Sequence, residues 1–192
     1  GAPWTVASYM IEGGGSREFA VIKRWAFADP DGFGKLIDLL VEAIADHLCA
    51  QVEAGAEVVQ LFDSWAGVLP EAAFRRWIIE PTRALVARFH AKHPDVPLIG
   101  FPRGAGLYYT QYAADTGVSA ISLDTTVPTS WAAKTLQPNL TVQGNLDPML
   151  LLVGGEGMME GVQRILDNLG QGPLIFNLGH GVVKETLPEH VA

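Results

Sequence analysis

The chain has 192 residues, of which 48% are hydrophobic, so it is long enough to bury one sizeable core. Its formal net charge of −8 argues against wholesale binding to nucleic acid or to an anionic membrane surface. The single cysteine, Cys49, excludes a disulfide within the chain and fits a reducing compartment. No apolar stretch approaches the length of a membrane span. We therefore expect a cytoplasmic enzyme.

Helical and extended patterns alternate along the chain. Residues 1–11 alternate small and apolar side chains, predict no defined element, and run into the glycine-containing loop 12–16. A proline flanked by two aspartates at 29–31 marks a helix start. In chain order, the apolar spacing then predicts a helix at 33–53, a strand at 57–62, a helix from 70 to about 93, a strand at 96–101, a helix at 108–116, a strand at 118–123, a helix at 130–136, a strand at 139–143, a helix at 157–169 and a strand at 173–177.

Each predicted strand stops abruptly in a polar tip, often with glycine. Parallel strands joined by crossover helices produce this rhythm, and such folds place their chemistry at the carboxyl ends of the strands. The tips are therefore a set of candidate site segments. They are residues 62–67, 101–104, 122–125, 143–147 and 177–181.

No composition break marks a linker, so we predict a single domain over residues 1–192. Two α/β architectures fit, the (β/α)8 TIM barrel and the open doubly wound sheet, and the modest length of the βα units favours the barrel. A whole barrel needs about 250 residues. We therefore expect an incomplete barrel of about the last five to six βα units, which is two-thirds to three-quarters of a longer protein. The absence of a start methionine, and the helix-like start at 188–192, fit this expectation.

Several familiar motifs are absent. The glycines at 13–15 lack the Gly-Lys-Ser/Thr end of a phosphate-binding loop, and no dinucleotide-binding fingerprint occurs there or at 104–106. Ser64 is not in a hydrolase nucleophile elbow, because Phe62 occupies the position of the required glycine. The histidines form no His-Glu-x-x-His motif and there is no cysteine cluster, so the sequence predicts no metal site.

Three side chains at or near the tips are candidates for ligand contact. Ser64 follows a predicted strand. The sequence leaves two roles open for its hydroxyl, which are contact with a ligand and a purely structural hydrogen bond. His180 lies between Gly179 and Gly181 at the tip of a strand predicted to be buried, where the backbone can approach a ligand closely. A histidine there can donate to a carboxylate or shuttle a proton. Tyr9 precedes the glycine loop, and its phenol needs a partner if it is buried.

Aspartates also occupy the tips. A carboxylate at such a position often caps the next helix. Capping is favoured for Asp147, which precedes Pro148, whereas the role of Asp124 stays open. Asp63 lies directly before Ser64.

Four segments of the chain resemble the signatures of the uroporphyrinogen decarboxylase family. They are residues 3–16, with Pro-Trp-Thr and Tyr-Met-Ile-Glu-Gly-Gly-Gly-Ser; 60–67, with Gln-Leu-Phe-Asp-Ser-Trp-Ala-Gly; 143–148, with Gln-Gly-Asn-Leu-Asp-Pro; and 177–181, with Asn-Leu-Gly-His-Gly. The similarity runs along essentially the entire chain, in order and at fitting spacing.

The resemblance implies a cofactor-free β/α barrel, usually a homodimer, that decarboxylates the acetate side chains of uroporphyrinogen III to give coproporphyrinogen III on the way to haem. By matching position, it implies that Tyr9, Ser64 and His180 contact the substrate. The family's arginine-rich segment and its central aspartate are expected upstream of Gly1, so no catalytic residue is assigned within this chain. Arg103 receives no inherited role.

Two alternatives accompany this interpretation. A corrinoid-linked methyltransferase on the same barrel would hold zinc through histidine and cysteine, and the chain lacks such ligands. The second alternative is an inactive truncated piece, because an incomplete barrel exposes apolar strand edges.

Overall fold

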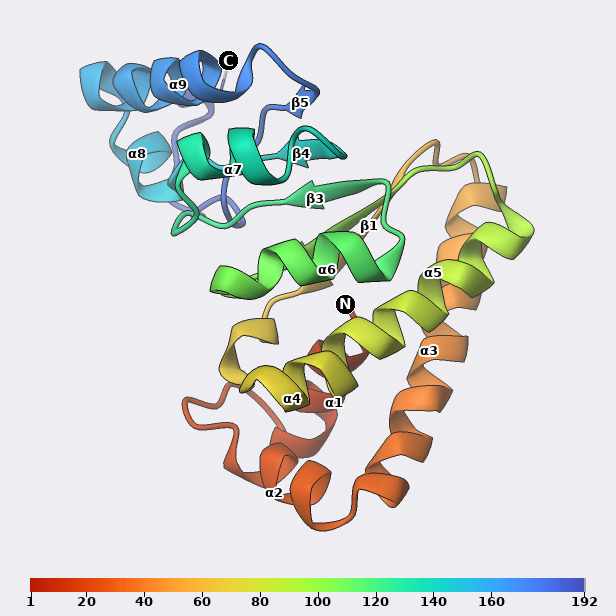
Figure 1. Cartoon of the computed structure of the whole chain (residues 1–192). Coiled ribbons are helices and arrows are strands. Elements are labelled where there is room, and N and C mark those ends of the chain that lie inside the picture. Colours follow the sequence, from red (N-terminus) through yellow and green to blue (C-terminus); the bar gives the residue numbers. More distant parts are fainter. Residues whose placement is uncertain (192) are drawn as a thin grey trace. The chain divides into compact units, whose positions relative to one another are not determined.

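The computed structural model describes residues 1–191 and divides into two compact units, which are described separately (Figure 1). The first unit is Gly1–Ser119 and the second begins at Ala120. Both combine helices with parallel strands. Among the described residues, no helix is both long and apolar enough to cross a membrane.

The first unit places a pair of parallel strands against a set of helices. Strands β1 and β2 pair with Val59 opposite Leu98 and Asp63 opposite Pro102. Helices α3 and α5 pack against each other (Figure 1), and α1 packs on α3. The elements are α1 (Pro3–Glu12), α2 (Ala20–Ala28), α3 (Pro30–Glu53), β1 (Val59–Asp63), α4 (Glu71–Phe74), α5 (Glu80–Lys92), β2 (Leu98–Pro102) and α6 (Tyr109–Thr116), with short 3-10 turns at Ala66–Val68 and Gly106–Tyr108.

The predicted helix from residue 70 to about 93 is present, but it is not uniform. A π-helical stretch, Arg75–Ile79, joins α4 to α5, and Glu80 N–H donates to Arg75 C=O. Pro81 follows directly and has no N–H to donate. Widening the turn before Pro81 removes the clash that its ring would otherwise make with the preceding turn.

Residues 1–11, for which no element was predicted, form most of helix α1. Pro3 occupies its first turn, and Gly13 ends it in a left-handed conformation with φ 71°. Glu12 then accepts hydrogen bonds at 3.0 Å from the backbone N–H groups of Val21 and Ile22, which caps α2. The glycine loop is therefore held between two helices by one carboxylate.

The second unit contains three parallel strands in chain order. Ile121 of β3 lies opposite Val142 of β4, which in turn lies opposite Leu174 of β5. Helix α7 packs against α9. The elements are β3 (Ala120–Ser122), α7 (Thr129–Thr135), β4 (Thr141–Gln143), α8 (Pro148–Val153), α9 (Gly155–Leu169), β5 (Leu174–Ile175) and a 3-10 turn at Pro188–His190.

The prediction of an α/β fold with parallel strands is confirmed, and three details differ. Helices α1, α2 and α8 were not predicted, and every strand is shorter at its start than expected. Strand β5 was predicted to be buried, but Leu174 is half-buried and Ile175 is 40% exposed. Among the described residues β5 pairs with β4 alone, so one edge of it remains open. Whether both units belong to a single domain stays a prediction.

Candidate functional site

The tip of β1 is fastened to the start of α1. The backbone N–H of Ala2 donates to Phe62 C=O at 2.7 Å, and Trp4 Nε1 donates to Trp65 C=O at 3.1 Å. Trp65 N–H donates to Thr5 Oγ1 at 3.3 Å. These contacts cross about sixty residues of sequence and fix the backbone on both sides of Ser64.

Asp63 is a buried acid at the centre of this junction. Its side chain is 1% exposed, and its Oδ1 accepts a hydrogen bond from Thr5 Oγ1 at 2.6 Å. Burial disfavours the charged carboxylate and raises the pKa of Asp63 from 3.8 to about 7, although the hydrogen bond from Thr5 acts in the opposite direction. Asp63 therefore joins β1 to α1 and does not cap the following helix.

Trp65 is the centre of an aromatic cluster beside Ser64. The Tyr9 ring lies edge-on to it, with ring centroids 6.2 Å apart, and the Phe19 ring lies 5.1 Å away. Tyr9 is 49% exposed and Ser64 is half-buried. Within residues 1–191 neither hydroxyl forms a hydrogen bond. The structure thus brings two of the three predicted contact residues to the same strand tip, with both hydroxyl groups available to a ligand.

The tips of β1 and β2 are in close backbone contact. Arg103 N–H donates to Asp63 C=O at 3.1 Å, and Gly67 N–H donates to Arg103 C=O at 3.0 Å. A Cβ atom on Gly67 would lie 2.3 Å from Gly104 C=O oxygen, so only glycine fits there without a shift of the backbone. This contact holds the segment after Ser64 in place.

In the second unit, polar side chains organise the tips of β3 and β4. Asp124 is buried, and its Oδ1 accepts from Thr126 N–H at 2.8 Å. Asn145 Nδ2 donates to the backbone oxygens of Asp124 and Val127 at 2.7 and 2.9 Å. Asp147 accepts from Met149 N–H at 2.9 Å, which confirms the predicted cap, here of α8.

His180 lies in the loop after β5, next to these tips. The preceding Gly179 donates its N–H to Leu146 C=O at 2.8 Å, and a Cβ on Gly179 would lie 2.6 Å from Thr125 N. The loops after all three strands of the second unit therefore touch one another. His180 itself is exposed. Its role in substrate contact stays a prediction, as do those of Tyr9 and Ser64.

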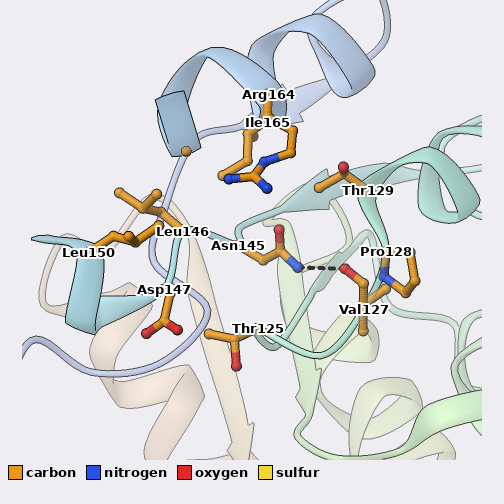
Figure 2. A pocket seen from close by; sticks show the side chains of 11 residues that line it. Thr125, Val127, Pro128, Thr129, Asn145, Leu146, Asp147, Leu150, Arg164 and Ile165 are labelled. Carbon is orange, nitrogen blue, oxygen red and sulfur yellow. Dashed lines mark hydrogen bonds between the residues drawn. The ribbon is translucent and has the colours of Figure 1, made fainter. Parts of the chain in front are cut away.

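A pocket of about 320 Å³ lies beside these loops (Figure 2). It is bounded by the segments after β3 and β4 and by α8 and α9, and Arg164 is the only basic residue of its lining. Sequence patterns did not indicate this pocket, because Arg164 reads as an ordinary exposed helix residue. Among residues 1–191, no group of three or more His, Cys, Asp or Glu side chains could hold a metal ion.

No sequence motif indicates the Thr5–Asp63 pair, although both residues lie in segments with recognisable signatures. The sequence shows Asp63 only as an acid between an apolar strand and Ser64. That feature alone does not reveal the partner 58 residues away.

Comparison with known proteins gives a consistent result over the whole chain. The uroporphyrinogen decarboxylase (URO-D) family model matches residues 1–192. Proteins named uroporphyrinogen decarboxylase from Rhodospirillum rubrum, Rhizorhabdus wittichii and Gluconobacter oxydans are 56%, 54% and 50% identical to the chain. Each alignment covers 100% of the chain but only 55%, 56% and 55% of the respective relative. The chain therefore spans about half the length of the relatives that it matches.

Proposed function

Since the chain belongs to the uroporphyrinogen decarboxylase family, we propose that the protein to which it contributes removes carbon dioxide from the acetate side chains of uroporphyrinogen III and yields coproporphyrinogen III. The family has a β/α barrel fold, and this chain is a part of such a barrel. The methyltransferase alternative is not favoured, because the family model and the named relatives are decarboxylases.

The proposed reaction needs an electron sink but no bound cofactor. Loss of carbon dioxide from an acetate arm leaves an electron pair, and a pyrrole protonated on a ring carbon accepts it. The exocyclic carbon then takes up a proton to become the methyl group and the ring carbon loses the proton it had gained, so one proton is consumed for each carbon dioxide released. The protein must therefore bind a polycarboxylate, transfer these protons and stabilise a cationic intermediate. A carboxylate facing the pyrrole N–H groups suits the last task, and the central aspartate of the family, expected upstream of Gly1, is our candidate for it.

Within this chain, the proposed role is to hold the carboxylate arms. The tip of β1 presents the hydroxyl groups of Tyr9 and Ser64 beside the Trp65 ring, and no other described group uses them. This is the observation that carries the proposal, because a free hydroxyl at a strand tip can donate to a carboxylate oxygen. We propose the same kind of contact for His180.

The net charge of −8 works against an anionic substrate, so the attraction must be local. The arginine-rich segment expected upstream of Gly1 would provide it.

We further propose that the enzyme is a cytoplasmic homodimer. The family resemblance supports this assembly, and analytical ultracentrifugation of the full-length enzyme, meaning a protein of the length of its relatives, would test it.

Kinetics of the full-length enzyme test the contact residues. We expect His180→Asn to lower kcat/KM for uroporphyrinogen without changing the unfolding temperature, because His180 is exposed. Ser64→Ala should lower kcat/KM by an amount equivalent to about 1–2 kcal/mol of transition-state stabilisation, which is the contribution of one hydrogen bond. His47→Asn is the matched control, since His47 is an exposed residue of α3 that contacts Gln51. Unchanged kinetics in His180→Asn would remove His180 from the site.

A further inference from the structure

The pocket of the second unit contains a cation without an ionic partner. Arg164 projects from α9 over the pocket (Figure 2). Within residues 1–191 its guanidinium forms neither an ion pair nor a hydrogen bond, although Glu160 and Asp167 are nearby on the same helix. The planar arrangement of its N–H donors matches a carboxylate, which it can bind through two parallel hydrogen bonds.

Gly161 shapes the space under this guanidinium. A Cβ atom at this position would lie 2.8 Å from Leu146 Cδ1 and 3.9 Å from Arg164 Nη2. The missing side chain therefore lets α9 approach the segment after β4, and the guanidinium lies at van der Waals distance from this position. The guanidinium of Arg164 therefore lies close to the apolar side chain of Leu146.

Thr129 supplies a second donor in the lining. Its Oγ1 accepts a hydrogen bond from Asn168 Nδ2 at 2.8 Å, so its own proton remains available to a ligand. The only acid of the lining is Asp147. Its carboxylate caps α8 and points away from Arg164 in Figure 2, so it does not neutralise the guanidinium.

The remaining wall combines the polar residues Thr125 and Asn145 with five apolar ones, Val127, Pro128, Leu146, Leu150 and Ile165. The volume is at the lower end of the range for small-molecule sites. We propose that this pocket binds a carboxylate carried on a short apolar body, with Arg164 as its counter-ion. The apolar wall receives the body, and the guanidinium and the Thr129 hydroxyl receive the charge.

Two sources share this chemistry, a free small organic acid and the carboxylated arm of a larger substrate. Thr125 lines the pocket and also contacts Gly179, the neighbour of His180. The pocket therefore adjoins the loop that we assign to the substrate. The second source rests on the proposed function, whereas the first does not.

Butyrate is a suitable probe, because it has a carboxylate on a short aliphatic chain, and butanol is its uncharged analogue. We expect saturation-transfer NMR on the full-length enzyme to detect butyrate binding and little butanol binding. Arg164→Gln should weaken butyrate binding at least about tenfold, since a charge-assisted contact is lost, and Arg164→Lys should retain part of it. Arg24→Gln, which removes an exposed arginine of α2 outside the pocket, should leave butyrate binding unchanged.

Absent butyrate binding, equal binding by the Arg164→Gln variant, or equal binding of butanol would each overturn the proposal. When butyrate binding is lost in the variant, the KM for uroporphyrinogen separates the two sources. A raised KM identifies a substrate arm as the natural ligand, and an unchanged KM identifies a free acid. Butyrate binding is measured without turnover, so this test stands even if the protein does not decarboxylate uroporphyrinogen.

Discussion

Burial of Asp63 links the stability of the fold to pH. The pKa of Asp63 is raised from 3.8 to about 7, so between these values the folded state keeps a proton that the unfolded state releases. The free energy of unfolding therefore falls as pH rises from 3.8 to about 7. Asp63 accounts for a fall of about 4 kcal/mol over this window, and its contribution no longer changes at higher pH. We expect Asp63→Asn to remove this slope, because the amide does not ionise and still accepts from Thr5.

Urea unfolding of the full-length enzyme at pH about 5 and about 8 measures the effect. The difference between wild type and Asp63→Asn isolates this group from the other titrating groups. Asp38→Asn, which removes a charge from an exposed position of α3, should follow the wild-type slope. An identical pH dependence in Asp63→Asn and wild type would contradict the assigned protonation.

Thr5 has a separate, structural effect through the same contact. Thr5→Val keeps the shape of the side chain but leaves the Asp63 carboxyl and Trp65 N–H without their shared hydroxyl. We expect a loss of about 1–3 kcal/mol in the free energy of unfolding, and a lower kcat/KM, because Ser64 lies between those two groups. Thr5→Ser should recover most of both losses. Full stability in Thr5→Val would show that the hydroxyl is dispensable.

At the scale of elements, the tip of β1 depends on its approach to the tip of β2. Gly67→Ala would place a methyl group against the backbone of Gly104, which cannot move independently of β2. We expect a loss of about 1–3 kcal/mol and a raised KM, measured by thermal unfolding and steady-state kinetics. Gly14→Ala is the control, since a Cβ there meets no atom within 4 Å. Equal effects of the two substitutions would refute this role for Gly67.

Most long elements could be predicted from the sequence, because their apolar spacing is regular. Helices α3 and α9 and the helix from α4 to α5 agree closely with their predicted ranges. Residues 1–11 gave no such pattern, because α1 buries small polar groups such as Ser8 together with Trp4 and Ala7. Helix α2 follows so soon after the loop that its start depends on Glu12, a contact that spacing does not reveal.

The candidate site was predictable only in part. The positions of Ser64 and His180 at predicted strand tips made them candidates. The structure places Tyr9 beside Trp65, the residue that follows Ser64. The partner of Asp63 and the pocket below Arg164 depend on contacts between segments that are distant in sequence. No local pattern encodes such contacts, so the structure was needed to find them.

For the whole molecule, the exposed apolar side chains of the strands fit a chain that covers about half of its relatives. Phe62 on β1 is 47% exposed, although its neighbours Leu61 and Asp63 are buried. On and after β5, Ile175 and Phe176 are 40% and 43% exposed. Within residues 1–191, no strand pairs with the outer edge of β1 or of β5, and on β1 that edge receives one backbone hydrogen bond, from Ala2 N–H to Phe62 C=O. Open edges with apolar side chains are sites of association between chains.

We therefore expect the 192-residue chain, produced alone, to be poorly stable, to self-associate and to show no decarboxylation of uroporphyrinogen. The full-length enzyme should be active under the same conditions, because a closed barrel has no open edges and carries the upstream segment to which we assign the aspartate and the arginines. Light scattering and a product assay on both proteins measure these differences. If the short chain were monomeric and catalytically competent, the residues needed for turnover would have to lie within it, and the assignment of the acid to an upstream segment would be wrong.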